Sequence, residues 1–119
     1  MSVAQPPIGS ISSLAASAEK IVGDVTLYRL ETFALTARVT YNAAATAGIR
    51  VKLYYSPDGD NYDTVAYGYY DVDLTAGGTI QETKLVDAPE NGNLRVAVEN
   101  LDAAQAATGI SVWVSIVPE

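Results

Sequence analysis

Histidine and cysteine are both absent from this 119-residue chain. The lack of histidine removes the usual general base of nucleophilic catalysis, so a Ser–His–Asp or Cys–His site is excluded. The lack of cysteine excludes a disulfide framework, and the chain is equally compatible with reducing and oxidising compartments. Nothing else in the sequence has the pattern of a catalytic motif. We therefore expect a protein that is not an enzyme.

Positive charge is scarce as well. The chain has 7 Lys and Arg residues against 14 Asp and Glu residues, a net charge of −7 and a pI near 4.3. Nucleic acids and anionic membranes are bound by positive faces, so neither is an expected partner. Charged residues make up only 18% of the chain, which is low for a small soluble domain. The low fraction of charged residues predicts a surface that is partly covered by other proteins, including further copies of this chain, and therefore a homo-oligomer.

Long hydrophobic runs are also missing. No stretch approaches the roughly 20 apolar residues of a membrane span, and the first residues lack the basic start and apolar core of a secretory signal. If the protein works outside a cell, we expect it to leave by lysis, through a dedicated machine or after a cleavage that the sequence no longer shows.

The features that are present are periodic. In residues 32–41, Phe33, Leu35, Ala37, Val39 and Tyr41 alternate with polar or small residues, which is typical of a strand with one face in a core. The same alternation recurs over residues 49–55, 94–98 and 110–116, with turn residues between the runs. About seven such strands without a helix predict one domain over residues 19–119, an antiparallel β-sandwich that is either Ig-like or jelly-roll-like.

The first 18 residues differ from this body. They mix Ser, Ala and Pro and show neither strand alternation nor a helical stripe. We interpret residues 1–18 as an extended N-terminal arm whose scattered apolar residues Ile8, Ile11 and Leu14 bind a neighbouring subunit. A loosely ordered terminus is the alternative.

Acidic residues gather in one loop. Asp58, Asp60 and Asp63 lie within six positions of each other and could supply oxygen ligands for calcium. Their spacing does not match the EF-hand loop, and turns prefer Asp, Gly and Asn for backbone reasons. The favoured interpretation is a turn with no metal, and no cofactor is expected.

Aromatic residues gather on two neighbouring strands. Tyr54, Tyr67, Tyr69 and Tyr70 lie there, and strand alternation directs some of them outward. An exposed aromatic patch binds proteins or glycans, whereas packing at the core and rim is the alternative. Trp113 lies between inward positions of the last strand, so it is expected to face outward or to fill a groove of a neighbour.

A family resemblance begins at the strand and turn of residues 51–64. This segment reads VKLYYSPDGDNYDT and resembles the strand, Ser-x-Asp-Gly-x-Asn-aromatic turn and strand of β-sandwich modules in tailed-phage structural proteins. Residues 94–100 and 112–114 resemble later strands of those modules, and the resemblance covers roughly residues 32–117. It implies a virion component, such as a capsid decoration or auxiliary protein, that binds a protein lattice such as a major capsid protein.

The functional prediction is therefore a non-enzymatic structural protein of a virus particle. Exposed strand edges, the arm and outward aromatic residues would attach it to the lattice. Two alternatives remain open: a secreted or cell-surface filament or adhesion subunit that assembles by strand complementation, and a glycan-binding module.

Overall fold

The computed structural model describes residues 7–27, 32–87 and 92–116. The described residues form eight strands and no helix. The strands are β1 (Gly9–Leu14), β2 (Glu19–Leu27), β3 (Thr32–Tyr41), β4 (Ile49–Ser56), β5 (Gly68–Asp71), β6 (Thr79–Asp87), β7 (Gly92–Asn100) and β8 (Ala107–Ile116). No helix long and apolar enough to cross a membrane occurs in these residues.

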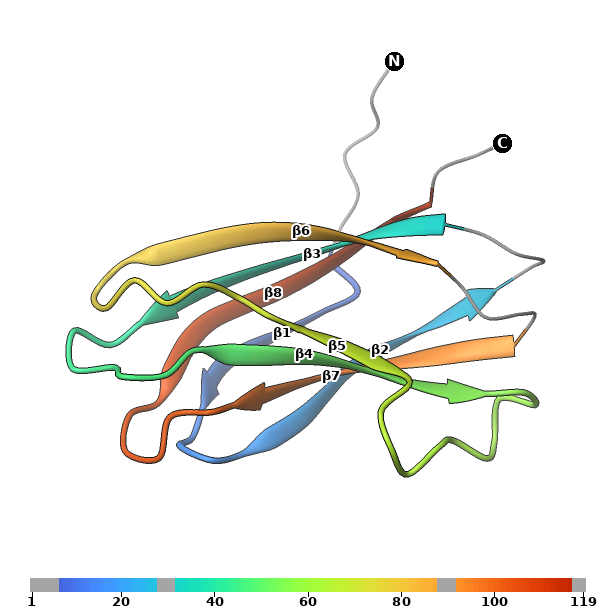
Figure 1. Ribbon diagram of the computed structural model, residues 1–119, viewed down its shortest axis with the longest axis horizontal. Helices are drawn as coiled ribbons and strands as arrows, with labels where there is room; N and C mark the ends of the chain where they lie inside the picture. Colours follow the sequence, from blue (N-terminus) through green and yellow to red (C-terminus); the bar gives the residue numbers. More distant parts are fainter. Residues whose placement is uncertain (1–6, 28–31, 88–91, 117–119) are drawn as a thin grey trace, which may run out of the picture.

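The strands form two antiparallel sheets (Figure 1). The first sheet has the order β1-β8-β3-β6 and the second the order β2-β7-β4-β5. Successive strands change sheet at every step except from β4 to β5, so residues 42–48 connect the two sheets. This interleaving is that of an eight-stranded jelly roll rather than an immunoglobulin domain. The predicted antiparallel sandwich is confirmed.

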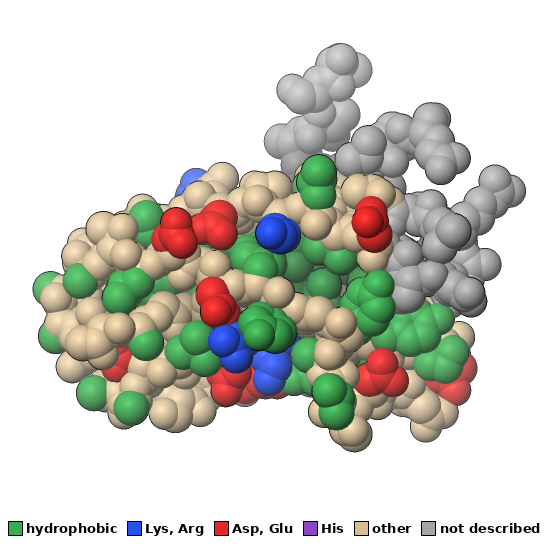
Figure 2. Space-filling view, viewed as in Figure 1, with side chains coloured by type: hydrophobic (Ala, Val, Ile, Leu, Met, Phe, Trp, Pro, Cys, Tyr) green, Lys and Arg blue, Asp and Glu red, His purple; other side chains and the backbone are tan. Residues whose placement is uncertain are grey.

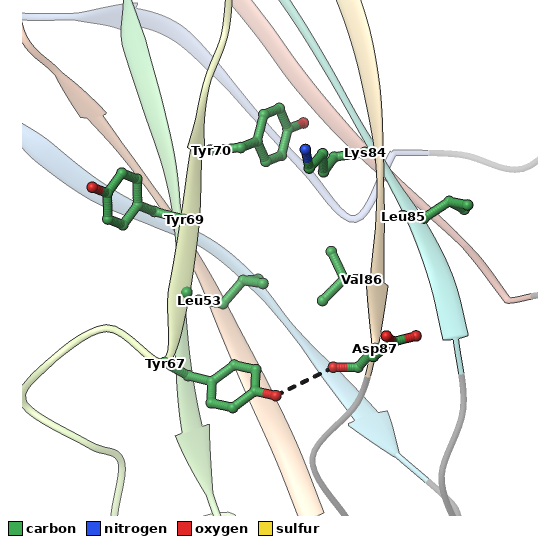
Figure 3. Close-up of a pocket in the computed structure, with 9 residues that line it drawn as sticks. Leu53, Tyr67, Tyr69, Tyr70, Lys84, Leu85, Val86 and Asp87 are labelled. Atoms are coloured by element: carbon green, nitrogen blue, oxygen red, sulfur yellow. Dashed lines mark hydrogen bonds between the residues drawn. The ribbon is translucent and has the colours of Figure 1, made fainter.

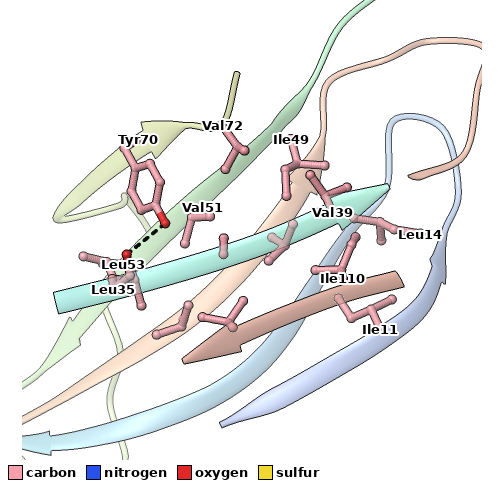
Figure 4. Close-up of a cluster of buried hydrophobic side chains, with 14 of the residues drawn as sticks. Ile11, Leu14, Leu35, Val39, Ile49, Val51, Leu53, Tyr70, Val72 and Ile110 are labelled. Carbon is pink, nitrogen blue, oxygen red and sulfur yellow. Dashed lines mark hydrogen bonds between the residues drawn. The ribbon is translucent and has the colours of Figure 1, made fainter. Parts of the chain in front are cut away.

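The core lies between the sheets and follows the predicted alternation. The burial of β3 alternates along its whole length, with Phe33 and Leu35 fully buried. Side chains from β4, β7 and β8 interdigitate with them (Figure 4). Burial of each such side chain contributes about 1.5–3 kcal/mol, so the core between the two inner faces is the main source of stability.

The structure differs from the prediction of an N-terminal arm. Residues 9–14 are strand β1, which pairs with β8 of the same chain. Ile11 and Leu14 are 7% and 0% exposed in the chain's own core, and Ile8 packs against that core. Ile11 and Leu14 are therefore not available to a neighbouring subunit, and this strand already completes its own sheet.

A glycine explains why alternation did not reveal β1. Gly109 in β8 has a positive φ of 58°, and the register between β3 and β8 shifts at this point. Such a bulge inserts an extra residue and changes which positions face inward. Ala107, Ile110 and Val112 of β8 are buried, and the bulge sets the first two three residues apart. Their partners in β1, Leu14 and Ile11, are buried with the same spacing of three.

One end of the sandwich is held by a buried carboxylate. Asp102, 2% exposed, accepts hydrogen bonds from the backbone N–H groups of Thr46, Ala47, Ala104 and Gln105 at 2.7, 3.2, 2.8 and 2.9 Å. These bonds favour the ionised form and hold the pKa of Asp102 well below its usual range. The side chain thereby joins the β3–β4 loop to the β7–β8 loop.

The two long sides of the sandwich differ. Along the β1–β2 side the backbones approach so closely that a Cβ on Gly9 would collide with the carbonyl oxygen of Val22. Along the β5–β6 side, β5 has only four residues, and β6 places the charged residues Glu82 and Lys84 opposite Ala37 and Leu35 of β3, at positions that face the interior. The sandwich is therefore closed on the first side and open on the second.

Candidate binding surfaces

The open side forms a groove between β5 and β6. Its volume is about 390 Å³. Figure 2 shows hydrophobic side chains in a depression along this side, with acidic and basic side chains around it. The groove is lined by Leu53, Tyr67, Gly68, Tyr69, Tyr70, Lys84, Leu85, Val86 and Asp87.

The inner part of the groove is apolar and fixed. Leu53 from β4 and Val86 from β6 lie between the two walls, and Tyr70 projects from β5 toward β6 (Figure 3). The Tyr70 hydroxyl donates a hydrogen bond to the backbone carbonyl of Leu35 at 3.2 Å, and burial raises the pKa of Tyr70 far above its usual value. Tyr70, predicted as a partner-binding residue, is only 8% exposed and serves as a wall.

Hydrogen bonds between the sheets close both ends of the groove. At one end the Tyr67 hydroxyl donates to the backbone carbonyl of Asp87 at 3.4 Å. At the other end the backbone N–H of Asp73 donates to Oε1 of Glu82 at 3.2 Å. The groove is consequently a bounded pocket that opens to the side.

Lys84 is the cation of this pocket. It lies on β6 between the two closing bonds, with its side chain toward Tyr70 (Figure 3). Three cations of the described residues form ion pairs: Arg50 with Asp71 at 2.7 Å, Arg95 with Asp24 at 3.0 Å, and Lys52 with Glu19 at 2.8 Å. Lys84 forms no ion pair with any residue in the described ranges.

The outer face of the second sheet carries two of the predicted tyrosines. The guanidinium of Arg50 stacks 4.2 Å from the ring centroid of Tyr69, which is 59% exposed. The Tyr54 hydroxyl donates to Glu19 at 3.0 Å. The predicted tyrosines thus do not form one patch, because Tyr54 and Tyr69 face outward whereas Tyr67 and Tyr70 border the groove.

Trp113 lies on the outer face of the first sheet. It is opposite Thr36 of β3, and the guanidinium of Arg38 lies 5.5 Å from its ring centroid. We call this surface the hydroxyl face, and it consists of Ser10, Thr36, Arg38, Thr40, Thr79, Gln81, Thr83, Thr108, Ser111 and Trp113.

The polar groups of the hydroxyl face are paired with each other. The oxygen–oxygen distances are 2.8 Å for Thr36–Thr83, 2.9 Å for Thr40–Thr79 and 3.2 Å for Ser10–Ser111. Arg38 also donates to Gln81 at 2.9 Å. From the Thr40–Thr79 row to the Ala34–Leu85 row, Arg38 is the only charged side chain at the described outward positions.

The acidic loop has the geometry of a turn. The carboxylate of Asp58 accepts hydrogen bonds from the Ser56 hydroxyl, the backbone N–H of Asp60, and the backbone and side-chain nitrogens of Asn61, at 2.7–3.0 Å. These bonds hold the pKa of Asp58 far below its usual range. Neither Asp60 nor Asp63 joins Asp58 in a cluster, and no group of three metal-binding side chains occurs in the described residues.

The sequence patterns did not identify Lys84 as a site residue. Leu85 is 66% exposed, and Val86 packs against the core instead. The spacing of apolar residues could have shown this: Val86 and Ile80 are six residues apart, and residues an even number apart lie on the same face of a strand. Glu82 and Lys84 lie between them on the same face, and these two charged residues obscured the alternation of apolar and polar residues.

Comparison with known proteins identifies the fold. No protein-family description matches the sequence, and no curated protein is significantly similar to it. Among solved structures, "CBM4 structure and function" matches with a TM-score of 0.62 and 17% identity over 91% of this chain and 70% of that one. "Family 16 Carbohydrate Binding Module-2" matches with a TM-score of 0.55 and 16% identity over 89% and 74%.

A viral structure has a similar fold. "Structure of infectious bursal disease virus Gx strain" matches with a TM-score of 0.50 and 12% identity, over 95% of this chain and 30% of that one. At these identities the similarities concern the fold alone. They define the chain as a β-sandwich of the kind found both in carbohydrate-binding modules and in a virus.

Proposed function

We propose that this protein is a non-enzymatic structural protein of a virus particle that binds a repeating protein lattice, such as a major capsid protein, through its hydroxyl face. One observation carries the proposal. In a chain of net charge −7, the described outward positions from the Thr40–Thr79 row to the Ala34–Leu85 row of these four adjacent strands have a single charged side chain, Arg38.

The pairing of the hydroxyl groups lowers the cost of covering this face. Burial of a polar group is unfavourable when it loses its hydrogen bonds to water without a replacement. On the hydroxyl face, one hydroxyl donates to the other within each of the pairs Thr36–Thr83 and Thr40–Thr79, so this hydrogen bond is kept when the face is covered. Trp113 adds a large aromatic side chain of the kind that dominates binding energy at interfaces.

Two further observations favour a virus particle. The strand and turn of residues 51–64 resemble those of tailed-phage structural modules, and the infectious bursal disease virus structure has a similar fold. The absence of histidine and cysteine agrees with a binding role without catalysis. The expected location is the virion.

The test counts this chain in purified particles. Particles from the source cells are banded in a density gradient, and quantitative mass spectrometry gives the ratio of this chain to the most abundant coat protein. We expect a fixed stoichiometric ratio across the band. Absence of the chain from particles that contain the coat protein would overturn the proposal.

A matched pair of variants then tests the face. Particles depleted of this chain are incubated with purified Thr83→Glu, which adds a negative charge to the hydroxyl face, or Thr64→Glu, which adds the same charge in an exposed loop. We expect Thr83→Glu to lose occupancy and Thr64→Glu to keep it, with both variants shown to be folded by circular dichroism. Equal occupancy would exclude this face.

Glycan binding is a second candidate because the ring of Tyr69 is presented to solvent. Arg50 covers one side of the Tyr69 ring, and the ring remains 59% exposed, so a sugar could stack on it. Retention on immobilised polysaccharides tests this candidate. Loss of retention in Tyr69→Ala but not in the exposed-residue control Val65→Ala would support it, and no retention of the unmodified protein would exclude it.

A further inference from the structure

We propose that the groove between β5 and β6 is a recognition pocket for a protein loop that presents a bulky apolar side chain next to a carboxylate. The pocket is separate from the hydroxyl face, so the two surfaces can be tested independently. Three features of the groove carry the inference: its apolar interior, its unpaired cation and its closed ends.

The interior accepts an apolar side chain. Leu53 and Val86 form an apolar floor, and the bond from Tyr70 to the Leu35 carbonyl fixes the wall beside it. The volume of about 390 Å³ is within the usual range for ligand pockets. A residue the size of Phe or Leu, together with the chain atoms beside it, would be accommodated.

The cation accepts a carboxylate. Lys84 has no ion pair within the described ranges, and the two neighbouring acids have other partners. Glu82 accepts the bond from the Asp73 amide, and the Asp87 carboxylate accepts one from the Thr32 hydroxyl at 2.8 Å. An incoming carboxylate would therefore meet an unpaired ammonium beside apolar surface, where a charged hydrogen bond is stronger than in water.

The closed ends determine how the partner enters. The Tyr67–Asp87 and Asp73–Glu82 hydrogen bonds prevent an extended strand from passing lengthwise through the groove. The inward-facing charges of Glu82 and Lys84 also protect the β6 edge against strand addition. The occupant is thus a pair of side chains inserted from the side, as a loop presents them.

The aromatic geometry disfavours a sugar at this position. Tyr70 is only 8% exposed, and the side chain of Tyr69 points away from the groove (Figure 3). The pocket therefore lacks the pair of open ring faces on which a glycan stacks.

The test is NMR titration of the full-length isotope-labelled protein with the blocked peptide Ac-Gly-Phe-Glu-Gly-NH2. We expect shifts centred on the amides of Leu53, Gly68 and Val86. The matched peptides with Gln for Glu, or Ala for Phe, should bind more weakly. Equal binding of the Gln peptide, shifts outside the groove, or no shift at several millimolar peptide would overturn the proposal, as would a cello-oligosaccharide that shifts these amides when the peptide does not.

Charge exchange tests the role of Lys84. Lys84→Gln should lower the affinity for the Glu peptide about fivefold, in line with the loss of a partly exposed ion pair. Lys20, like Lys84, has no ion pair among the described residues, and Lys20→Gln should leave the affinity unchanged. In Lys84→Glu, the peptide with Lys in place of Glu should become the better ligand. If Lys84 only protects the strand edge, its variants will change self-association in sedimentation velocity without changing peptide selectivity, which would contradict the pocket.

Discussion

At the scale of single residues, the hydroxyl of Tyr41 connects three segments of the core. It accepts a hydrogen bond from the backbone N–H of Ile49 and donates one to the carbonyl of Val72, both at 3.2 Å. Burial raises the pKa of Tyr41, because the phenolate would lose its hydration. The neutral phenol is therefore a structural link between β3, β4 and the segment after β5.

Tyr41→Phe should lower the free energy of unfolding by about 2 kcal/mol, because it leaves two buried backbone groups without a partner. Urea denaturation measures the change. Tyr69→Phe is the control, since the exposed Tyr69 ring keeps its contact with Arg50 and the effect should be within about 0.5 kcal/mol. Equal losses in the two variants would contradict the role of the Tyr41 hydroxyl.

Asp102 makes the stability of the fold depend on pH. Its folded-state pKa is lowered by four backbone N–H donors, so its stabilisation is complete above the unfolded pKa, about 3.9. The stabilisation is lost as the pH falls through the lower, folded-state value.

The melting temperature of Asp102→Ala should be several degrees below that of the unmodified protein at neutral pH. This difference in melting temperature should become smaller as the pH falls below about 4. Thermal unfolding followed by circular dichroism across this range measures both effects. Asp63→Ala, at an exposed loop position, should have little effect at any pH. A difference for Asp102→Ala that stays constant down to about pH 2 would rule out titration of this carboxylate as the cause.

At the scale of the strands, the sequence predicted those with uninterrupted alternation. β3 alternates along its whole length, and the inward residues of β4 and β7, such as Val51 and Val96, were predicted correctly. Ala97 of β7 lies at an outward position and is buried as well. β1 was not predicted because the bulge at Gly109 changes the spacing of inward residues from two to three. β5 has only four residues, and Val65, a residue type typical of strands, is 77% exposed in the loop before it.

The candidate surfaces were predictable only in part. Alternation correctly placed Tyr54 and Trp113 on outward faces. It could not show that the two sheets separate at β5 and β6, because this depends on strand pairing between distant parts of the chain. The role of Lys84 follows from that separation, since a charged residue on the inward face of an edge strand resembles ordinary surface in the sequence.

Gly9→Ala should destabilise the fold by about 1–3 kcal/mol, because the added Cβ would collide with the carbonyl oxygen of Val22 and force β1 away from β2. Gly68→Ala is the matched control, since nothing lies within 4 Å of a Cβ at that position. Urea denaturation compares the two, and hydrogen exchange at Ile11 reports on β1 directly. Equal stability of both variants would show that β1 is loosely held.

At the scale of the whole molecule, strand pairing joins distant parts of the chain. Within the described residues β1 pairs with β8 alone, and the first sheet is complete only when both strands are present. Folds dominated by such pairings fold slowly, because loop-closure entropy is lost before the contacts form.

We expect refolding from urea in milliseconds to seconds, the range of non-local β-sandwich topologies. Stopped-flow fluorescence of Trp113, the single tryptophan of the chain, measures the rate. A main refolding phase in microseconds would mean that local contacts, and not the β1–β8 pairing, limit folding.

The charge distribution predicts pH-dependent association. Near the pI of about 4.3 the net repulsion between copies disappears, and the face with least charge becomes the easiest contact. Sedimentation velocity should detect oligomers there that Thr83→Glu reduces and Thr64→Glu does not. Oligomers that form equally in both variants would place the contact outside the hydroxyl face.

The pairing of β1 with β8 also makes the molecule suitable for circular permutation. Gly9 is opposite Val112, and the backbone N–H of Ile8 donates to the Val112 carbonyl at 2.8 Å. A short linker between these neighbouring strands, with a new opening in the loop of residues 42–48, would retain every strand pairing described here. The termini of such a circular permutant would lie at the opposite end of the sandwich. A peptide fused to a terminus could therefore be displayed at either end of the same fold, depending on which version of the chain carries it.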